Sequence, residues 1–157
     1  MTDNDLPAFV PTPPGLYRHY KGGWYEVLDT VRCSETLQAM VVYRALYGAF
    51  GTWVRPAAMF NERGTFEGQD QPRFQRVSVA NVTPRDQASA QALIAHLRTR
   101  ARQVGVDLDS ALRAPPPEPT TCCGRGCNGC VWEGYHHAVR YWADDALAVL
   151  APPSARP

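Results

Sequence analysis

The sequence lacks a long hydrophobic run, because nowhere in its 157 residues do eighteen uncharged apolar residues follow one another. A helix needs about that length to cross a bilayer, so no membrane span is predicted. The first residues, Met-Thr-Asp-Asn-Asp-Leu-Pro, are acidic and interrupted by proline, whereas an export signal is basic and then apolar. These absences predict a cytoplasmic protein.

An excess of charge of either sign is also absent. Sixteen basic and fifteen acidic residues leave a net charge of +1, and no basic stripe stands out along the chain. Nucleic-acid-binding domains carry such a stripe, so the sequence does not predict a nucleic-acid partner. The length suits one ordinary domain or two small ones, and an apolar content of 45% suffices for a modest core.

Familiar catalytic motifs are missing as well. The sequence contains no Gly-rich phosphate loop, no nucleophile elbow and no HExxH motif. His19 with Glu26 or Glu62 could form an acid–base pair, but a single histidine beside a turn is more often structural. The chain is therefore not expected to be an enzyme by itself.

Cysteine is nearly absent outside one segment. Cys33 stands alone, whereas the other four cysteines lie within nine Gly-rich residues: Cys122, Cys123, Cys127 and Cys130. Thiols stay reduced in the cytoplasm, which favours metal binding over disulfides. Thiolates this close in a Gly-rich loop can converge on one soft metal centre. We expect these four cysteines to bind zinc or an iron–sulfur cluster.

The cysteine spacing does not choose between these metals. Cys127 and Cys130 form the C-x2-C pair of zinc sites, but Cys122 and Cys123 are adjacent, and the side chains of adjacent residues usually point apart, which makes the other two ligands harder to choose. With Cys122 the spacing is that of plant-type ferredoxins without their distant fourth cysteine. With Cys123 it is that of radical S-adenosylmethionine enzymes, for whose large barrel the chain has no residues.

Two histidines, His136 and His137, follow the cysteines but are not expected to be metal ligands. On a helix that begins near Val131, His137 lies about 10 Å beyond Cys130 and His136 points elsewhere, so neither is expected to bind the metal. Two alternatives to metal binding remain: a thiol redox pair before a helix N-terminus, or thiols that only pack a tight turn.

The N-terminal half has the pattern of short antiparallel strands. Aromatic and β-branched residues are concentrated in four segments separated by turn signals, residues 16–21, 24–32, 38–47 and 52–56. A further hairpin around Gly64 to Gly68 leads to a last strand at residues 72–77. After a disordered or extended lead-in at residues 1–14, residues 15–80 are thus expected to form a small barrel of about five strands.

The C-terminal half has helical periodicity. Thr83 is a candidate N-cap, Pro84 fits the first helical position, and an apolar stripe from Leu93 to Val104 ends at Gly105, which predicts a connecting helix of roughly twenty residues within 81–113. A Pro-rich spacer at residues 114–121 marks a module boundary. The cysteine loop and an amphipathic helix from about 131 to 150 form the segment 122–150, before a tail at 151–157.

Cationic and aromatic residues alternate along the barrel strands. Such side chains can stack on and hydrogen-bond a small anionic or aromatic ligand, or a protein partner. Small barrels also cover an exposed core edge with the same residue types, so both interpretations remain open. The candidate ligand-binding residues are Arg18, His19, Tyr43, Arg44, Trp53, Arg55, Phe60 and Arg73.

Several blocks in the N-terminal half resemble a bacterial family, the domain of unknown function 1653. They occur in the family's order, over about residues 14–77, at positions 15–22, 25–27, 42–44, 46–48, 53–56 and 72–74, with Met59, Phe60 and Glu62. The resemblance implies a small Src-homology-3-like β-barrel of unassigned function.

The cysteine segment resembles a second family, the oxidoreductase-like domain. The matching residues are 117–119, the stretch 122–133 with all four clustered cysteines, and Tyr135, and the likeness covers about residues 115–150. The resemblance implies a module with a redox association and no assigned reaction.

Taken together, these patterns predict a β+α protein with a small Src-homology-3-like barrel, a connecting helix, and a cysteine loop followed by an amphipathic helix. The predicted function is that of a cytoplasmic two-module protein, a β-barrel recognition module joined to a zinc or iron–sulfur module. The alternative is a redox-active accessory protein, whose cysteines exchange electrons or disulfides while the barrel docks a partner.

Overall fold

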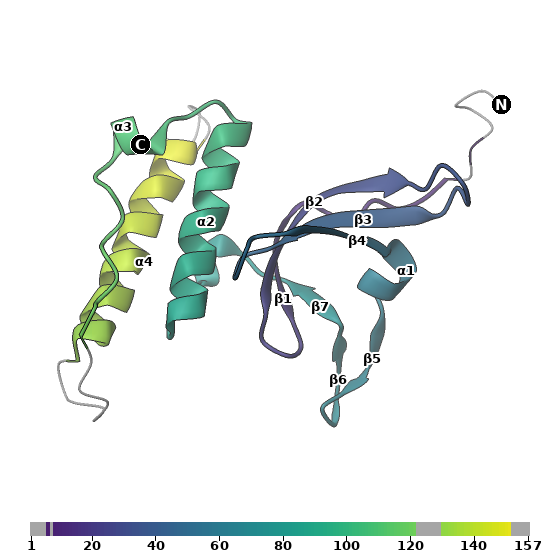
Figure 1. Cartoon of the computed structure of the whole chain (residues 1–157), viewed down its shortest axis with the longest axis horizontal. Coiled ribbons are helices and arrows are strands. Elements are labelled where there is room, and N and C mark those ends of the chain that lie inside the picture. The colour runs from purple at the N-terminus through teal and green to yellow at the C-terminus, as the bar shows by residue number, and fades with distance from the viewer. Residues whose placement is uncertain (1–5, 7, 122–129, 152–157) are drawn as a thin grey trace. The chain divides into compact units, whose positions relative to one another are not determined.

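The computed structural model describes residues 6, 8–121 and 130–151, which belong to two compact units, residues 1–77 and 78–157. The first unit contains β1 (Gly15–His19), β2 (Trp24–Arg32), β3 (Ala39–Ala45), β4 (Thr52–Pro56), α1 (Ala57–Phe60), β5 (Arg63–Phe66), β6 (Gln69–Pro72) and β7 (Phe74–Arg76). The second contains the 3₁₀ turn η2 (Val79–Asn81), α2 (Gln87–Gln103), α3 (Leu108–Ala111) and α4 (Val131–Leu150) (Figure 1).

The first unit is built on an antiparallel sheet with the strand order β4-β3-β2-β1-β7. The strands expected at residues 24–32 and 52–56 have the expected bounds. Among the described residues the sheet stays open, with β4 and β7 as its edges, so the closed barrel expected from the sequence is not formed. The physical reason is that β5 and β6 pair with each other and extend neither edge.

The hairpin β5–β6 appears where its turn residues predict it. Phe66 pairs with Gln69, and the two residues between them, Glu67 and Gly68, have φ angles of 52° and 78°. Positive φ at both central positions is typical of the tight turn that matches the twist of antiparallel strands. Glycine adopts this conformation without a steric penalty, which explains its place at position 68.

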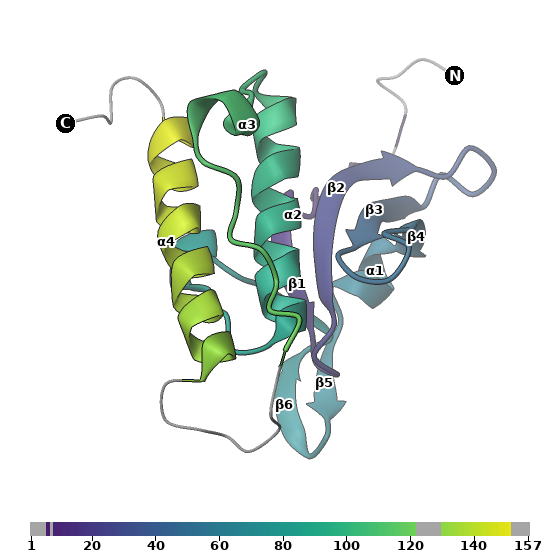
Figure 2. The ribbon, with the colours of Figure 1, turned by 60° about the vertical axis from the view of Figure 1, so that its left-hand side comes forward.

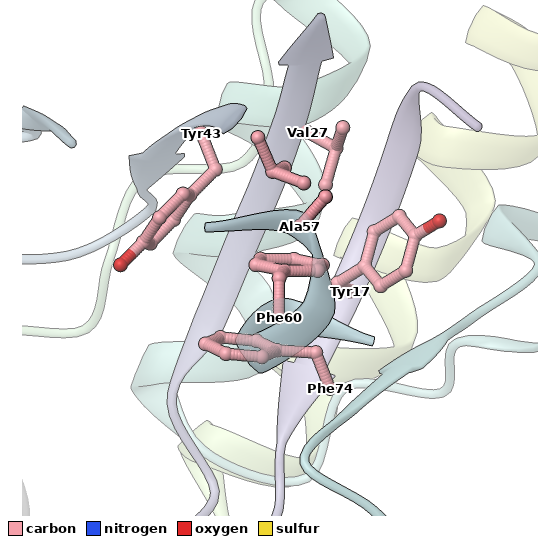
Figure 3. Close-up of a cluster of buried hydrophobic side chains, with 7 residues drawn as sticks. Tyr17, Val27, Tyr43, Ala57, Phe60 and Phe74 are labelled. Carbon is pink, nitrogen blue, oxygen red and sulfur yellow. The ribbon is translucent and has the colours of Figure 1, made fainter. Parts of the chain in front are cut away.

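An aromatic core lies on one face of the sheet (Figure 3). Phe60 is completely buried, and its ring stacks on that of Phe74 with the centroids 4.1 Å apart and the planes inclined by 5°. Phe60 is carried by the short helix α1, which the strand pattern did not predict. The buried members of this core are Tyr17, Val27, Val41, Tyr43, Ala57, Phe60 and Phe74.

The end of the Pro-rich lead-in is held against the sheet unit. The backbone N–H of Thr12 donates to Oγ1 of Thr30 at 2.9 Å, and Asn61 donates to the Thr12 hydroxyl at 2.8 Å. The Tyr17 hydroxyl donates to the carbonyl of Pro13 at 2.8 Å. These bonds make the end of this segment extended and ordered.

Helix α2 begins later than its first capping signal suggests. The N-cap is Asp86, whose carboxylate accepts from the backbone N–H of Ser89 at 2.8 Å, while the Ser89 hydroxyl accepts from the Asp86 backbone N–H at 3.2 Å. This reciprocal pair satisfies two backbone donors, so it replaces the expected cap at Thr83. The helix ends as expected before Gly105, whose φ is 72°.

Helices α2 and α4 pack against each other in the second unit (Figure 2). The expected helix at residues 131–150 is confirmed with these bounds. Small residues on the buried faces permit close packing, and the buried apolar side chains of the two helices are Ala90, Ala92, Leu93, Leu97, Ala101, Tyr135, Val139, Trp142, Ala143 and Ala146. No helix within the described ranges is long and apolar enough to cross a membrane.

The Pro-rich spacer runs alongside both helices, as Figure 2 shows. The Trp142 indole donates to the carbonyl of Arg113 at 3.0 Å. Further along, the Glu118 carboxylate accepts from Gln87 at 3.0 Å and from Gln91, one turn later on α2, at 2.8 Å. The spacer is therefore packed within the second unit, and the division between the two units falls after residue 77.

Candidate functional site

Strand register places Trp53 and Arg55 on the same face of the sheet as the aromatic core. Trp53 lies directly opposite Tyr43, and Arg55 lies opposite Val41, and both partners are buried in that core. Side chains opposite each other in neighbouring strands point to the same side. Trp53 nevertheless remains 60% exposed, because β4 is the edge strand.

Arg55 extends from β4 over the aromatic core. Its Nε donates to the Tyr43 hydroxyl at 3.4 Å, and its Cζ lies 5.8 Å from the centre of the Phe74 ring. No residue in the described part of the chain forms an ion pair with Arg55 within 4.0 Å. The guanidinium is thus positioned by an aromatic ring and a phenol, and its charge is not neutralised there.

Tyr25 and Tyr47 lie beside the aromatic core near Arg55 and Phe74. The hydroxyl groups of Tyr25 and Tyr47 are 2.6 Å apart, within hydrogen-bonding distance. Burial raises the pKa of Tyr25, and the hydrogen bond with Tyr47 raises this pKa further. Tyr25 also packs edge-on against Phe74 at 5.4 Å, whereas Tyr47 is 45% exposed. The Tyr25 phenol is therefore neutral at physiological pH.

His19 lies at the end of β1, opposite Phe74 on β7. Its ring contacts those of Phe74 and Tyr20, with centroids 4.7 Å and 4.3 Å away. Burial lowers the pKa of His19, and the nearby cations Arg73, Arg55 and Lys21 lower it further. The imidazole is therefore neutral at physiological pH, and Arg55 and Lys21 contribute positive charge to its surroundings.

Arg73 is the cation of this region whose charge is neutralised locally. Glu62 accepts from its Nη2 at 2.6 Å and from its Nε at 2.9 Å, and the guanidinium also lies over the Phe66 ring at 5.0 Å. Phe66 in turn stacks on Tyr20 at 4.5 Å. Arg73 thus attaches the β5–β6 hairpin to the sheet.

A polar cavity of about 340 Å³ lies beside β1 and the hairpin, lined in part by Arg18, His19, Gln69, Gln71 and Gln75. Arg18 stacks on Trp24 with its Cζ 5.4 Å from the ring centre. Of the predicted site residues, Arg18 and His19 line this cavity.

Arg44 lies on the opposite face of the sheet from Arg55. It is directly across from Glu26, and its Nη2 donates to that carboxylate at 2.5 Å. The Glu26 side chain is only 3% exposed, so this ion pair is largely desolvated on the carboxylate side. The structure therefore does not bring Arg44 together with Trp53 and Arg55. Arg44 is next to Tyr43 in β3, and successive side chains of a strand point to opposite faces of the sheet.

The eight predicted ligand-binding residues thus divide into groups. His19, Trp53, Arg55 and the hydroxyl of Tyr43 lie on the core face of the sheet. Phe60 is completely buried and its ring is part of the core. Three residues of this face were not among the candidates: Tyr25, Tyr47 and Phe74. The sequence shows that these three residues are aromatic, but their proximity to one another depends on the pairing of β1, β2, β3 and β7.

The cysteine segment is described only at its end. Cys130 is half-buried and is the N-cap of α4, while Cys122, Cys123 and Cys127 lie outside the described residues. Within the described part of the chain, no group of three or more His, Cys, Asp and Glu side chains could hold a metal ion. His137 is exposed, and His136 packs near Trp132 and Tyr135. The expected four-cysteine site stays a prediction.

Comparison with known proteins identifies both parts of the chain. Residues 15–76 match the model of the family described as protein of unknown function (DUF1653), and residues 110–150 match the model of the oxidoreductase-like protein, N-terminal. No curated protein matches the chain.

One solved structure is similar to this chain: the crystal structure of a DUF1653 protein from Bordetella bronchiseptica. Its sequence is 39% identical, and the match covers 47% of this chain and 95% of that chain, with a TM-score of 0.42. The family models thus show a two-module protein, with a DUF1653 domain at residues 15–76 and an oxidoreductase-like module at residues 110–150.

Proposed function

We propose that this protein is a cytoplasmic two-module recognition protein: its sheet unit binds an anionic group through Arg55, and its cysteine segment binds zinc or an iron–sulfur cluster. The observation that carries the first half is the position of the Arg55 guanidinium. It lies over Phe74, it donates to Tyr43, and no carboxylate of the described residues lies within ion-pair distance of it.

The charge of this face favours an anion over a cation. Arg55 and Lys21 both lie close enough to His19 to lower the pKa of its imidazole, and the neutral ring can still donate a hydrogen bond because its Nδ1 is the nitrogen that accepts from the Lys21 backbone. Glu62 accepts two hydrogen bonds from Arg73, which balances its negative charge. A guanidinium binds a carboxylate or phosphate through two parallel hydrogen bonds.

The aromatic side chains favour a ligand in which the anion is attached to an apolar or planar group. Trp53 and Tyr47 are exposed by 60% and 45%, and Phe50 in the loop between β3 and β4 is exposed by 41%. Exposed aromatic rings next to an arginine are typical of binding surfaces. The flat rings provide contact area while the guanidinium selects the charge.

Replacing Arg55 with glutamine is expected to weaken binding of phenyl phosphate and benzoate by at least about tenfold, since a charge-assisted hydrogen bond contributes roughly 1.5–3 kcal/mol. Binding is measured by chemical-shift titration of the labelled protein. The free energy of unfolding should change by no more than about 1 kcal/mol, because the bond to Tyr43 is long, at 3.4 Å.

Arg63→Gln is the matched control, because the Arg63 side chain is 62% exposed on the hairpin and pairs with Asp70. It should bind both probes like the wild type. Equal affinity in wild type and Arg55→Gln would contradict the anion site, and a large loss of stability in Arg55→Gln would instead assign the arginine a structural role.

The second half of the proposal rests on the four clustered cysteines. Replacing Cys127 or Cys130 with serine is expected to abolish stoichiometric metal binding, because a structural zinc site or a cluster needs all of its thiolates. Metal analysis and visible absorbance of protein purified without oxygen measure this effect. His137→Ala serves as the control and should keep the metal, since His137 is exposed on α4. Wild-type protein without metal would refute this half of the proposal.

A further inference from the structure

The edge strand β4 has an unpaired backbone side. The backbone N–H of Ala45 donates to the carbonyl of Gly51, which makes these two a hydrogen-bonded pair. Hydrogen-bonded pairs alternate along an antiparallel ladder, so Trp53 and Arg55 also turn their backbone groups toward β3. The N–H and C=O groups of Thr52 and Val54 therefore point outward, where no other described strand pairs with β4.

This edge is poorly protected against an additional strand. Proteins usually block exposed edges with charged side chains, bulges, proline or a covering segment. Along β4 the residues of these kinds are Arg55 and, at the strand's end, Pro56, while Trp53 and Val54 are exposed by 60% and 56%. The pairing between β3 and β4 is regular, without a bulge. The edge thus offers a donor and an acceptor at each of two residues.

We propose that β4 is a docking site for an extended acidic peptide, which adds to the sheet as an antiparallel strand and places a carboxylate opposite Arg55. This inference rests on the proposed anion site and identifies its ligand as the side chain of a partner protein. In this arrangement the peptide residue opposite Val54 exchanges two backbone hydrogen bonds with it. The next peptide residue on either side then lies opposite Arg55 or Trp53, on the core face of the sheet.

Charge complementarity favours an acidic partner over a second copy of this chain. Pairing two β4 strands about Val54 would place two Arg55 guanidinium groups on one face of the joined sheet, neither of them ion-paired with a described residue. A glutamate at the position opposite Arg55 would instead neutralise the guanidinium and could form bidentate hydrogen bonds. An apolar residue two positions further along would lie against the exposed Trp53 ring.

The test uses the peptide acetyl-Ser-Thr-Glu-Val-Leu-Thr-Ser-amide, whose glutamate falls opposite Arg55 when its valine pairs with Val54. It is titrated into the labelled full-length protein. We expect binding to protect the Thr52 and Val54 amides from hydrogen exchange, and a peptide with glutamine in place of glutamate to bind at least about tenfold more weakly. Binding that leaves both amides unprotected would overturn strand addition.

Val54→Pro separates strand addition from the anion site. Proline removes the outward N–H of residue 54, which donates to no described strand, and proline is tolerated at such edge positions. The variant should lose at least about tenfold in peptide affinity and keep its affinity for phenyl phosphate within about twofold. Val54→Ala keeps the N–H and should bind the peptide nearly as well as the wild type. Amide spectra of the free proteins verify that both variants are folded.

The remaining outcomes are distinct. Unchanged peptide affinity in Val54→Pro, or wild-type protein that binds phenyl phosphate and not the peptide, would refute strand addition and leave the anion site intact. Wild-type protein that binds neither probe would refute both. A dimer in light scattering that Val54→Pro abolishes would assign the edge to a second copy and overturn the peptide proposal.

Discussion

Phe60→Ala is expected to lower the free energy of unfolding of the sheet unit by about 4 kcal/mol, near the upper end for a single core substitution. Phe60 is completely buried and lies in ring contact with Phe74 at 4.1 Å, Tyr43 at 5.3 Å and Tyr17 at 5.5 Å. Alanine leaves a cavity at the centre of these rings, which the sheet can close only in part.

The same substitution should also disturb the candidate site. Phe74 is the ring against which His19, Tyr25 and Arg55 lie, at 4.7, 5.4 and 5.8 Å. Once the stacking partner of Phe74 is removed, these side chains lose a common support. Chemical denaturation measures the stability, and the amide and aromatic chemical shifts of the variant report on the site.

Phe50→Ala provides the control for the Phe60 substitution, because Phe50 is 41% exposed in the loop between β3 and β4. It should change the free energy of unfolding by no more than about 1 kcal/mol. If Phe60→Ala were as mild as Phe50→Ala, the aromatic core would not be the main source of stability in the sheet unit.

A fragment that ends at Arg113 is expected to lose helix α2 together with α4. The two helices bury apolar faces against each other, and the spacer attaches to both through Arg113, Glu118 and Trp142. An isolated helix of 17 residues is marginal in water, so α2 without α4 should be largely unfolded. The sequence alone, which placed a module boundary at the Pro-rich spacer, suggested instead that the part before the spacer would fold without α4.

Circular dichroism and amide chemical shifts measure this effect. The fragment 1–113 should retain strand signals and lose the helical signal of α2, whereas the fragment 78–157 should retain both helices. A helical α2 in the fragment 1–113 would show that contacts other than those with α4 are enough to hold it.

The strands, helices and turns whose conformation depends on a few consecutive residues could be predicted from the sequence. Alternating aromatic and β-branched residues placed β2 and β4 with their observed bounds, and helical periodicity did the same for α4. The turn at Glu67 and Gly68 and the end of α2 before Gly105 followed from glycine at positions with positive φ. Such features are local, because periodicity and turn geometry involve only a few consecutive residues.

The functional face depended on contacts between distant parts of the chain. The sequence grouped Arg44 with Trp53 and Arg55 because all three are cationic or aromatic, but the register between β2, β3 and β4 places Arg44 next to Glu26 on the other face. The short helix α1 determined that Phe60 belongs to the core. Pairing of β1 with β7 brought His19 next to Phe74.

The sequence by itself thus determined two family modules, the strand and helix pattern, and the residue types available for binding an anion or a metal. The tertiary structure decided that the sheet stays open at β4 among the described strands and that the spacer packs beside α2 and α4. It also decided that Arg44 and Arg73 pair with carboxylates, whereas Arg18 and Arg55 form no ion pair with a described residue. The physical reason is that secondary structure follows from local periodicity, whereas the face and the neighbours of a side chain follow from strand register and helix packing.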